Sequence, residues 1–424
     1  MNPAPQPLLA TPSRGMAAGA WRQLSIVVAV GTLVLLGWRQ QVYHGITIGY
    51  VVALALVPLC LPAIRRFRGY PAFFVLGVAS LASGFLLYSF NKVNHQVDSS
   101  KLIINPALLL GLLLATGVVL WARTLMPDWL VGLAYGFGLL LGVVHDADVA
   151  VNPWKFGYSL PVIVMALSLA VFVDGHLGVR RRIASLLALA ALAAYSGLHD
   201  SRSLFAMLVL AMVLVGWQML PVGRSRRAAV ARTLLTAAAV VAVVYEVGSS
   251  LLVDGYLGAA AQQRSIAQIN ESGSLILGGR PEIAATVALF LSQPLGFGVG
   301  IVPSLHDIAV AKAGMLAINY QPNNGYVEQY MFGSQFELHS SIGDLWVYFG
   351  LVGLLLGAVT IWLMLRFTVV SIVTRTGNVV ALFLAVITLW NLFFSPLYSS
   401  VTIMGLAIGM VALPGRGKPA ENAA

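Results

Sequence analysis

Residues 104–122 read INPALLLGLLLATGVVLWA, 19 consecutive residues without a charge. A helix needs about 20 predominantly apolar residues to cross the hydrocarbon core of a bilayer. This run therefore predicts a transmembrane helix. Similar runs recur on both sides of it, from residue 21 to residue 415, and most of the polar connections between them are short.

The composition of the whole chain agrees with that interpretation. Of its 424 residues, 9% are charged and 59% are hydrophobic, and the mean hydropathy is +0.86. A soluble domain carries about 25% charged residues. So few charges cannot cover the surface of a soluble protein of this size, which excludes a soluble enzyme, a disordered chain and a collagen-like rod. The predicted fold class is an all-α polytopic membrane protein.

Twelve runs are candidate membrane spans. They are residues 21–38, 45–64, 71–90, 104–122, 129–146, 156–174, 183–198, 204–221, 233–252, 342–365, 377–396 and 399–415. The predicted organisation is listed here from the N-terminus: a tail over 1–20, nine spans within 21–253, a large and partly helical outer loop over 254–341, three spans within 342–415, and a tail over 416–424. An even number of spans places both tails on the same side of the membrane.

Lysine and arginine predict the orientation. If the N-terminus is cytoplasmic, 17 of the 25 basic residues lie on the cytoplasmic side and 8 lie outside. Cytoplasmic loops are expected to carry such an excess. Three arginine clusters fall together on the cytoplasmic side: Arg65, Arg66 and Arg68; Arg180, Arg181 and Arg182; and Arg224, Arg226 and Arg227. Both termini are therefore predicted to be cytoplasmic, and the net charge of +10 follows from topology, with membrane lipid and no nucleic acid as the partner.

Three pairs of small residues, four positions apart, lie within the predicted spans. They are Gly138 and Gly142, Gly353 and Gly357, and Gly405 and Gly409. Such pairs let two helix backbones approach closely, so we expect each of them to pack against a neighbouring helix.

The loop over residues 254–341 is much longer than the other connections, and a loop of this length is usually functional. Within it, residues 283–291 form an apolar run that predicts a half-buried helix. Pro281 suits a first helical turn, and Glu282 suits the positive end of the helix dipole. Residues 294–300 (PLGFGVG) are expected to end that helix. The rest of the loop is rich in Tyr, Asn and Phe, as at a membrane interface or a sugar-binding face.

The polar groups best suited to chemistry lie near the outer face. His339, at the start of the tenth span, can take a proton from an alcohol if a partner orients its other ring nitrogen. The alternative is an interfacial histidine that caps a helix. Arg280 and Arg264 carry guanidinium groups, which match phosphate oxygens and keep their charge. The alternative for these two is solvated loop charge.

Further candidates lie in the tight outer turn between spans seven and eight and inside the spans. Arg202 breaks the positive-inside trend in that turn, where Asp200 is a candidate ion-pair partner and His199 is a weaker candidate for proton transfer. Glu246 and Asp344 are ionisable groups within predicted spans, and such groups are functional candidates by default.

Several common site signatures are missing from the sequence. There is no nucleotide phosphate-binding loop and no His-Glu-x-x-His motif. Residues 296–300 (GFGVG) have the wrong spacing for a dinucleotide fingerprint, and Asp146 and Asp148 near His145 are a weak metal signal. The single cysteine, Cys60, excludes an intrachain disulfide. We therefore expect no metal and no cofactor.

Several elements, taken together, resemble the O-antigen ligase and O-antigen polymerase superfamily of polytopic bacterial membrane proteins. They are Ser201-Arg202, Gly279-Arg280, residues 294–300, and His339-Ser340-x4-Leu345-x4-Gly350-x2-Gly353. The twelve-span layout and the large outer loop before the tenth span are also similar to the family. Two positions depart from its pattern: Ser340 stands where the family usually has Asn, and Gly343 stands where its Leu would fall.

The resemblance implies a metal-independent, inverting glycosyltransferase of the bacterial inner membrane. Such an enzyme moves a glycan from an undecaprenyl-pyrophosphate carrier to an acceptor hydroxyl at the periplasmic face, in O-antigen or exopolysaccharide assembly. Arg202, Arg280 and Arg264 would clamp the donor pyrophosphate, His339 would take the proton of the acceptor hydroxyl, and Ser340 would help to orient the acceptor. Polysaccharide export and chain-length proteins would be candidate partners.

The sequence leaves three questions open. A ligase and a polymerase differ in their acceptor, which is lipid A core or another lipid-linked glycan, and the sequence does not decide between them. Twelve helices also fit a secondary transporter or a flippase-type exporter of polysaccharide precursors, although the repeated halves of such transporters are not found. A third interpretation is a non-catalytic scaffold or export partner of the same pathway.

Overall fold

The computed structural model describes residues 14–176, 182–219, 262, 263, 266, 269 and 280–415. These residues fold almost entirely into helices, with one short antiparallel ladder between β1 (Gln41–Tyr43) and β2 (Ile46–Thr47). The helices up to residue 219 are α1 (Arg14–Trp38), α2 (Ile48–Ala55), α3 (Val57–Ile64), α4 (Tyr70–Asn91), α5 (Ser99–Ala122), α6 (Asp128–Leu141), α7 (Ala147–Val151), η1 (Trp154–Tyr158), α8 (Ser159–His176), α9 (Ile183–Leu198) and α10 (Arg202–Trp217). Those from residue 280 onward are α14 (Glu282–Ser292), α15 (Leu305–Leu316), η2 (Val327–Met331), α16 (Ser341–Thr374), α17 (Val379–Phe394) and α18 (Leu397–Met410).

The described part of the chain has the helices expected of an all-α membrane protein. Five helical stretches there are long and apolar enough to cross a bilayer: Gly19–Trp38, Tyr70–Asn91, Ser99–Ala122, Trp154–His176 and Ser341–Thr374. Shorter apolar helices, α6, α9, α10, α17 and α18, coincide with five more of the predicted spans. The count of twelve spans stays a prediction, because the ninth predicted span, residues 233–252, lies outside the described residues.

The second predicted span, residues 45–64, is not one helix. It consists of α2 and α3, which meet at Leu56. Pro58 lies in the first turn of α3 and has no N–H group with which to continue the hydrogen bonds of α2. The proline therefore separates an apolar run that hydropathy alone joins into a single span.

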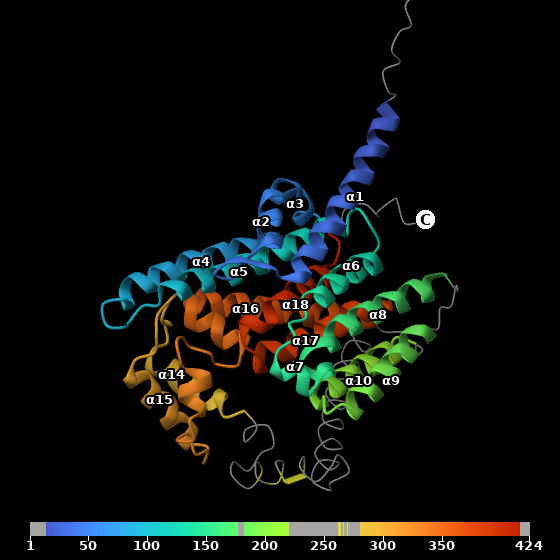
Figure 1. The fold of residues 1–424 in the computed structure, drawn as a ribbon. Helices are drawn as coiled ribbons and strands as arrows, with labels where there is room; N and C mark the ends of the chain where they lie inside the picture. The colour runs from blue at the N-terminus through green and yellow to red at the C-terminus, as the bar shows by residue number, and fades with distance from the viewer. Residues whose placement is uncertain are drawn as a thin grey trace, which may run out of the picture.

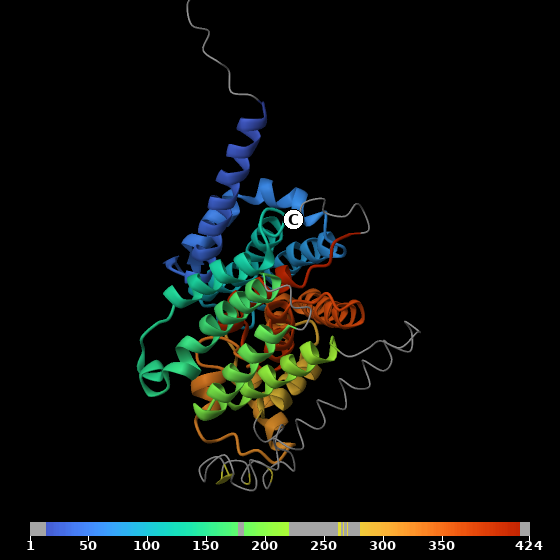
Figure 2. The same cartoon turned by 90° about the vertical axis from the view of Figure 1, so that its right-hand side faces the viewer.

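Several arginines that were predicted to share one side of the membrane meet at one end of the molecule. The Arg66 carbonyl accepts the N–H of Gly415 at 2.8 Å. The Arg123 guanidinium donates to the carbonyls of Gly409 at 2.8 Å and Ala412 at 3.0 Å. Figures 1 and 2 show the N-terminal half of α1 at this end and α14 and α15 at the opposite end.

The helix formed by the central apolar run, α5, is buried in protein rather than in lipid. Between Asn105 and Ala122, every residue except Pro106 and Leu110 is buried. It packs against α18, α3 and α1, so α5 is the central helix of the bundle.

Two of the three glycine pairs pack closely against a neighbouring helix, as predicted. A Cβ built on Gly138 would lie 2.2 Å from the Val34 carbonyl oxygen of α1. A Cβ on Gly409 would lie 2.4 Å from Val119 Cγ1 of α5. Larger residues at these positions would push α6 away from α1 and α18 away from α5.

The tenth predicted span, residues 342–365, is broken. Gly350 has φ 67° and ψ −155°, which divides α16 into a first arm, residues 341–349, and a second arm, residues 351–374. A Cβ on Gly357 would lie 2.8 Å from Ile342 Cγ1, and a Cβ on Gly353 would lie 2.1 Å from the Leu345 carbonyl oxygen. Fifteen residues of straight helix span about 22 Å, so the first arm folds back along the second. The Gly353 and Gly357 pair therefore packs against an arm of its own helix.

The break in α16 releases a backbone acceptor. In an unbroken helix the Val347 carbonyl would bond to the N–H of Leu351. Here it accepts the N–H groups of Phe297 and Gly298, both at 2.9 Å. A buried carbonyl without a partner is costly, so the break in α16 and the seating of this segment depend on each other.

The segment of residues 296–300 passes between α4, α5 and α16 with no room for side chains at its glycines. Gly296, Gly298 and Gly300 have φ values of 88°, 105° and 72°. A Cβ on Gly298 would lie 2.4 Å from the backbone nitrogen of Tyr88 in α4. The run does end the helix at residue 292, as predicted, and it also fastens α14 and α15, at the end opposite the arginines, to the bundle.

Replacing Gly298 with alanine tests this seating. Gly298→Ala is expected to destabilise the protein by about 3 kcal/mol, because the new Cβ meets α4 backbone and the positive φ is strained for any residue with a side chain. The measurement is the midpoint of thermal unfolding in detergent. Gly175→Ala in α8 is the matched control, since its Cβ meets nothing within 4 Å. Equal midpoints for the two variants would contradict this account.

Candidate functional site

The candidate site is the region around His339 and Arg280. The connection between α17 and α18 lies on its inner side and is called the floor of the site. These helices have 16 and 14 residues, which correspond to lengths of about 24 and 21 Å. Both are shorter than the hydrocarbon core of about 30 Å. At the other end, Arg182 donates to the Gly377 carbonyl before α17 and Arg123 donates to the Gly409 carbonyl of α18. The first residues of α17 and the last residues of α18 lie at the arginine end, so the connection between them, residues 395–396, is only about 21–24 Å from that end, less than the thickness of a hydrocarbon core.

The start of α16 is fastened to this floor by two serines. Ser340 is the N-cap of α16: its hydroxyl accepts the N–H of Gly343 at 3.2 Å and donates to the Leu392 carbonyl at 2.9 Å. Ser341 donates to the Ser395 carbonyl at 2.9 Å. Both hydrogen-bonding roles of the Ser340 hydroxyl are thus in use, which gives this residue a structural task. Its predicted part in orienting an acceptor stays a prediction.

Asp344 completes the attachment. Its carboxylate accepts the N–H of Leu338 at 3.1 Å and the N–H of Leu397 at 2.7 Å, and the residue is 3% exposed. Leu397 is the first residue of α18, so Asp344 ties the segment before α16 to α18. These two bonds account for a buried carboxylate that the sequence offered as a functional candidate.

His339 lies between Leu338, whose N–H is bonded to Asp344, and Ser340, whose hydroxyl is bonded to the Leu392 carbonyl of α17. Its backbone has φ 49°, and its ring is half-buried. Nδ1 lies 3.2 Å from the carbonyl oxygen of Glu337. A carbonyl oxygen can only accept, so in the neutral ring Nδ1 carries the proton and Nε2 is the unprotonated nitrogen. This is the orienting partner that the sequence analysis required of a proton acceptor.

Arg280 precedes α14 and reaches the same region. Its guanidinium lies 6.0 Å from the centre of the Phe394 ring, at the end of α17. Glu282, the first residue of α14, is 4% exposed and accepts a hydrogen bond from the Tyr326 hydroxyl. The other carboxylate oxygen of Glu282, Oε2, is buried without a hydrogen-bond partner among the described residues.

Tyr326 lies beside His339 and is bonded to Glu282, two residues after Arg280. Its ring centre lies 6.1 Å from that of His339 and 5.6 Å from that of Tyr330. Burial raises the pKa of the Tyr326 phenol, the Glu282 carboxylate adds to the rise, and the nearby Arg280 charge opposes it only in part. The phenol is therefore a protonated donor. Arg280 and His339 also lie near one place, the end of α17, where Arg280 is beside Phe394 and Ser340, next to His339, donates to the Leu392 carbonyl. Arg280, Tyr326 and His339 are called the cluster.

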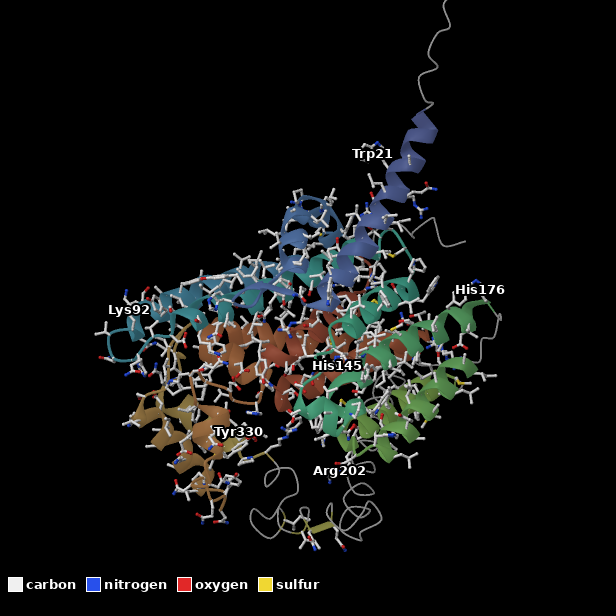
Figure 3. All side chains as sticks on the ribbon, in the orientation of Figure 1. Trp21, Lys92, His145, His176, Arg202 and Tyr330 are labelled. Atoms are coloured by element: carbon white, nitrogen blue, oxygen red, sulfur yellow. The ribbon has the colours of Figure 1, made fainter. Side chains whose placement is uncertain are left out.

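The turn that carries Arg202 is built separately. The Nε atom of Arg202 lies 3.6 Å from Asp200 Oδ1, and Lys155 Nζ lies 3.9 Å from Asp200 Oδ2. Such long, partly exposed ion pairs contribute little stability, which leaves the guanidinium available to an anion. Among the described residues, no recorded contact joins Arg202 to Arg280 or His339. Figure 3 shows Arg202 and Tyr330 at the same lower edge of the molecule, on separate parts of it.

His199 has a helix-ending role in this turn. Its Nδ1 lies 2.9 Å from the Tyr195 carbonyl oxygen, and its ring stacks on the Tyr195 ring with centres 3.9 Å apart. Its backbone carbonyl accepts a hydrogen bond from the Asn152 side chain at 2.8 Å. These contacts brace the end of α9. The Nδ1 contact is of the same kind as the one that orients His339, but among the described residues no contact joins His199 to Arg280 or Tyr326.

The remaining candidates do not add to the cluster. Asp146 caps α7 by accepting the N–H of Val149 at 3.0 Å. No group of three or more His, Cys, Asp or Glu side chains suited to a metal occurs in the described part of the chain. Arg264 and Glu246 lie outside the described residues.

Two residues in or beside the cluster, Tyr326 and Glu282, were not recognised as site residues from the sequence. Glu282 was assigned only a helix-dipole role, and Tyr326 was one of many aromatic residues in the loop. A signal was present: Glu282 is the last ionisable residue before the uncharged residues 283–305. A carboxylate at the start of an apolar helix needs a donor, and that requirement points to a nearby hydroxyl.

Comparison of the chain with protein-family models gave no match, and comparison with curated protein sequences gave no significant match.

The structural role of Asp344 can be tested through stability. Asp344→Asn replaces one acceptor oxygen with a donor group and leaves a buried backbone N–H unpaired. The expected loss is about 1–3 kcal/mol, measured as a lower thermal midpoint in detergent. Asp146→Asn is the control, because asparagine caps a helix as well as aspartate does. An unchanged midpoint for Asp344→Asn would show that its two bonds are not needed.

Proposed function

We propose that this chain is a membrane glycosyltransferase. It moves a glycan from an undecaprenyl-pyrophosphate carrier to an acceptor hydroxyl at the periplasmic face of the bacterial inner membrane, as a ligase or polymerase of O-antigen or exopolysaccharide. The observation that carries the proposal is that Arg280 and His339 both lie near the end of α17: the Arg280 guanidinium is 6.0 Å from the centre of the Phe394 ring, and Ser340, next to His339, donates to the Leu392 carbonyl. Arg280 and His339 come from sequence elements almost 60 positions apart, and both had been selected for this reaction from the sequence.

The histidine geometry suits proton acceptance. With Nδ1 bonded to a carbonyl, Nε2 takes the proton of the acceptor hydroxyl as its oxygen attacks the anomeric carbon. The bond between the anomeric carbon and the pyrophosphate oxygen breaks in the same displacement, and the pyrophosphate keeps the electron pair. One displacement inverts the anomeric configuration.

Arginine suits the departing group. Arg280 keeps its charge at any physiological pH and bonds to phosphate oxygens in pairs, so it stabilises negative charge as the pyrophosphate leaves. Arg202 and Arg264 are proposed to assist. With arginines in that role the reaction needs neither a metal nor another cofactor.

The position of the cluster suits a lipid-borne donor. The floor of the site lies short of the outer membrane surface, because α17 and α18 are too short to reach it. A carrier whose chain lies in the bilayer would present its pyrophosphate near this level. The acceptor is then lipid A core or a second lipid-linked glycan, and polysaccharide export or chain-length proteins are proposed as partners.

Reconstitution with a lipid-linked oligosaccharide tests the proposal. The purified protein in proteoliposomes should transfer the glycan, giving longer lipid-linked chains if it is a polymerase or glycosylated lipopolysaccharide core if it is a ligase. His339→Ala should lower the rate by at least about 100-fold. His306→Ala is the matched control, since His306 is an exposed histidine of α15 in the same outer region. Near-normal product from His339→Ala would show that His339 is not the proton acceptor. Movement of a solute across the membrane without glycan transfer would contradict the proposed enzymatic function.

The paired N–H donors of the Arg280 guanidinium can be tested separately from its positive charge. Arg280→Lys keeps the charge but loses the paired geometry, so transfer should fall about 10- to 100-fold. Arg366→Lys, at the opposite end of the bundle, should leave transfer unchanged. Full activity of Arg280→Lys in the same proteoliposome assay would contradict a two-bond contact to pyrophosphate.

A further inference from the structure

The outer helix α14 has an exposed apolar side. Val287 is 52% exposed, Leu291 is 73% exposed and Leu295, just beyond the helix, is 63% exposed. These three residues are called the α14 apolar face. No ionisable residue occurs from residue 283 to residue 305, so no charge interrupts this surface along the chain.

The α14 apolar face lies next to residues that face lipid. A Cβ on Gly350 would lie 2.7 Å from both the Leu295 carbonyl oxygen and Leu87 Cδ1 of α4. Beside these positions, Leu86 of α4 is 58% exposed and Leu351 of α16 is 47% exposed. Both α4 and α16 are among the helices long and apolar enough to cross a bilayer. Leu86 and Leu351, each next in the chain to one of these positions, are called the α4–α16 apolar belt, and the Leu295 backbone is packed beside it.

The depth of this contact can be read along α4. Lys92 follows the last residue of α4 and is exposed, as is usual where a helix leaves the hydrocarbon. Leu87 lies five residues earlier, about 7 Å deeper along the helix axis. Leu295, at the level of Leu87, is therefore below the membrane surface.

We propose that α14 and the turn that follows it are inserted in the outer leaflet, with the α14 apolar face against lipid acyl chains. The sequence alone predicts these residues in a loop outside the membrane. The proposal places α14 beside the membrane-spanning helices as a short, partly inserted helix. It depends on the membrane character of the fold and not on the proposed glycan transfer, so the two can fail separately.

Three features favour lipid over other occupants. The surface lies beside the α4–α16 apolar belt, it carries no charge, and its depth matches a position five residues inside the end of α4. A water-facing helix of an outer loop would show polar residues on its exposed side. Here the exposed residues of α14 are Val287, Leu291 and Ser292, and those just beyond it are Pro294 and Leu295, so Ser292 is the one polar side chain among them.

Site-directed spin labelling in proteoliposomes tests the insertion. Single cysteines at Val287, Leu291 and Leu295 are made in a Cys60→Ser background, where the only native cysteine is removed. Leu355→Cys is the lipid-facing control, since Leu355 of α16 is 54% exposed. Asn323→Cys is the water-facing control, because Asn323 is exposed and its hydrogen bond is to an exposed part of Lys312. Each label is measured for collisions with oxygen and with a water-soluble nickel complex.

The proposal predicts that the labels at positions 291 and 295 have high accessibility to oxygen and low accessibility to nickel, as the label at position 355 has. Their ratio of oxygen to nickel accessibility should be several-fold higher than that of the label at position 323. High nickel accessibility at Leu291 and Leu295 would mean that α14 lies in water and would overturn the proposal. Low accessibility to both reagents would mean that protein, such as a second copy of the chain, covers the face, and would overturn it as well. Glycan transfer by the same labelled variants reports on the proposed function independently.

Discussion

The Val347 carbonyl accepts two backbone N–H groups from residues 296–300, and it is free to do so because α16 breaks at Gly350. Many other features of the part of the molecule that contains α14 and the candidate site depend on this change in the hydrogen-bond partners of the Val347 carbonyl. The break turns the first arm of α16 back along the second, which brings residue 340 down to the end of α17. The same bonds hold the segment that follows α14, so they also fix α14. Arg280 lies at one end of α14 and His339 lies just before the first arm, and one backbone interaction therefore positions both.

Two buried carboxylates near the candidate site, Asp344 and Glu282, hold the structure rather than carry exposed charge. Asp344 bonds two backbone N–H groups, and Glu282 accepts from Tyr326. Burying a carboxylate is costly unless donors surround it. Each of these donors belongs to a segment next to the candidate site, so the cost of burial is offset by a more defined geometry around His339 and Arg280.

The sequence was sufficient for the helices but not for the break in α16. Apolar runs predicted the positions of α4, α5, α9 and α10 within a few residues, because a helix that crosses or lines a bilayer needs a long uncharged run. Hydropathy could not show that Gly350 adopts a positive φ, or that Pro58 divides the second span, since both depend on backbone geometry rather than apolarity. Arg280 and His339 were predicted to act at one site; both lie near the end of α17, and their shared role stays a prediction. Tyr326 was not predicted to join them, because the contact that singles it out is to Glu282, which is 44 residues away in the chain. Arg202 was predicted to join them, and the described residues record no contact that does so.

The central claim is that Arg280 and His339 border one site for a lipid-linked pyrophosphate. The most direct measurement is an electron cryomicroscopy map of the protein in lipid nanodiscs with undecaprenyl pyrophosphate bound. The account predicts density for the pyrophosphate against the Arg280 guanidinium, within reach of the His339 ring, with the lipid chain leading into the bilayer. Pyrophosphate density at the arginine-rich end of the bundle, or none near Arg280 at saturating lipid, would contradict it.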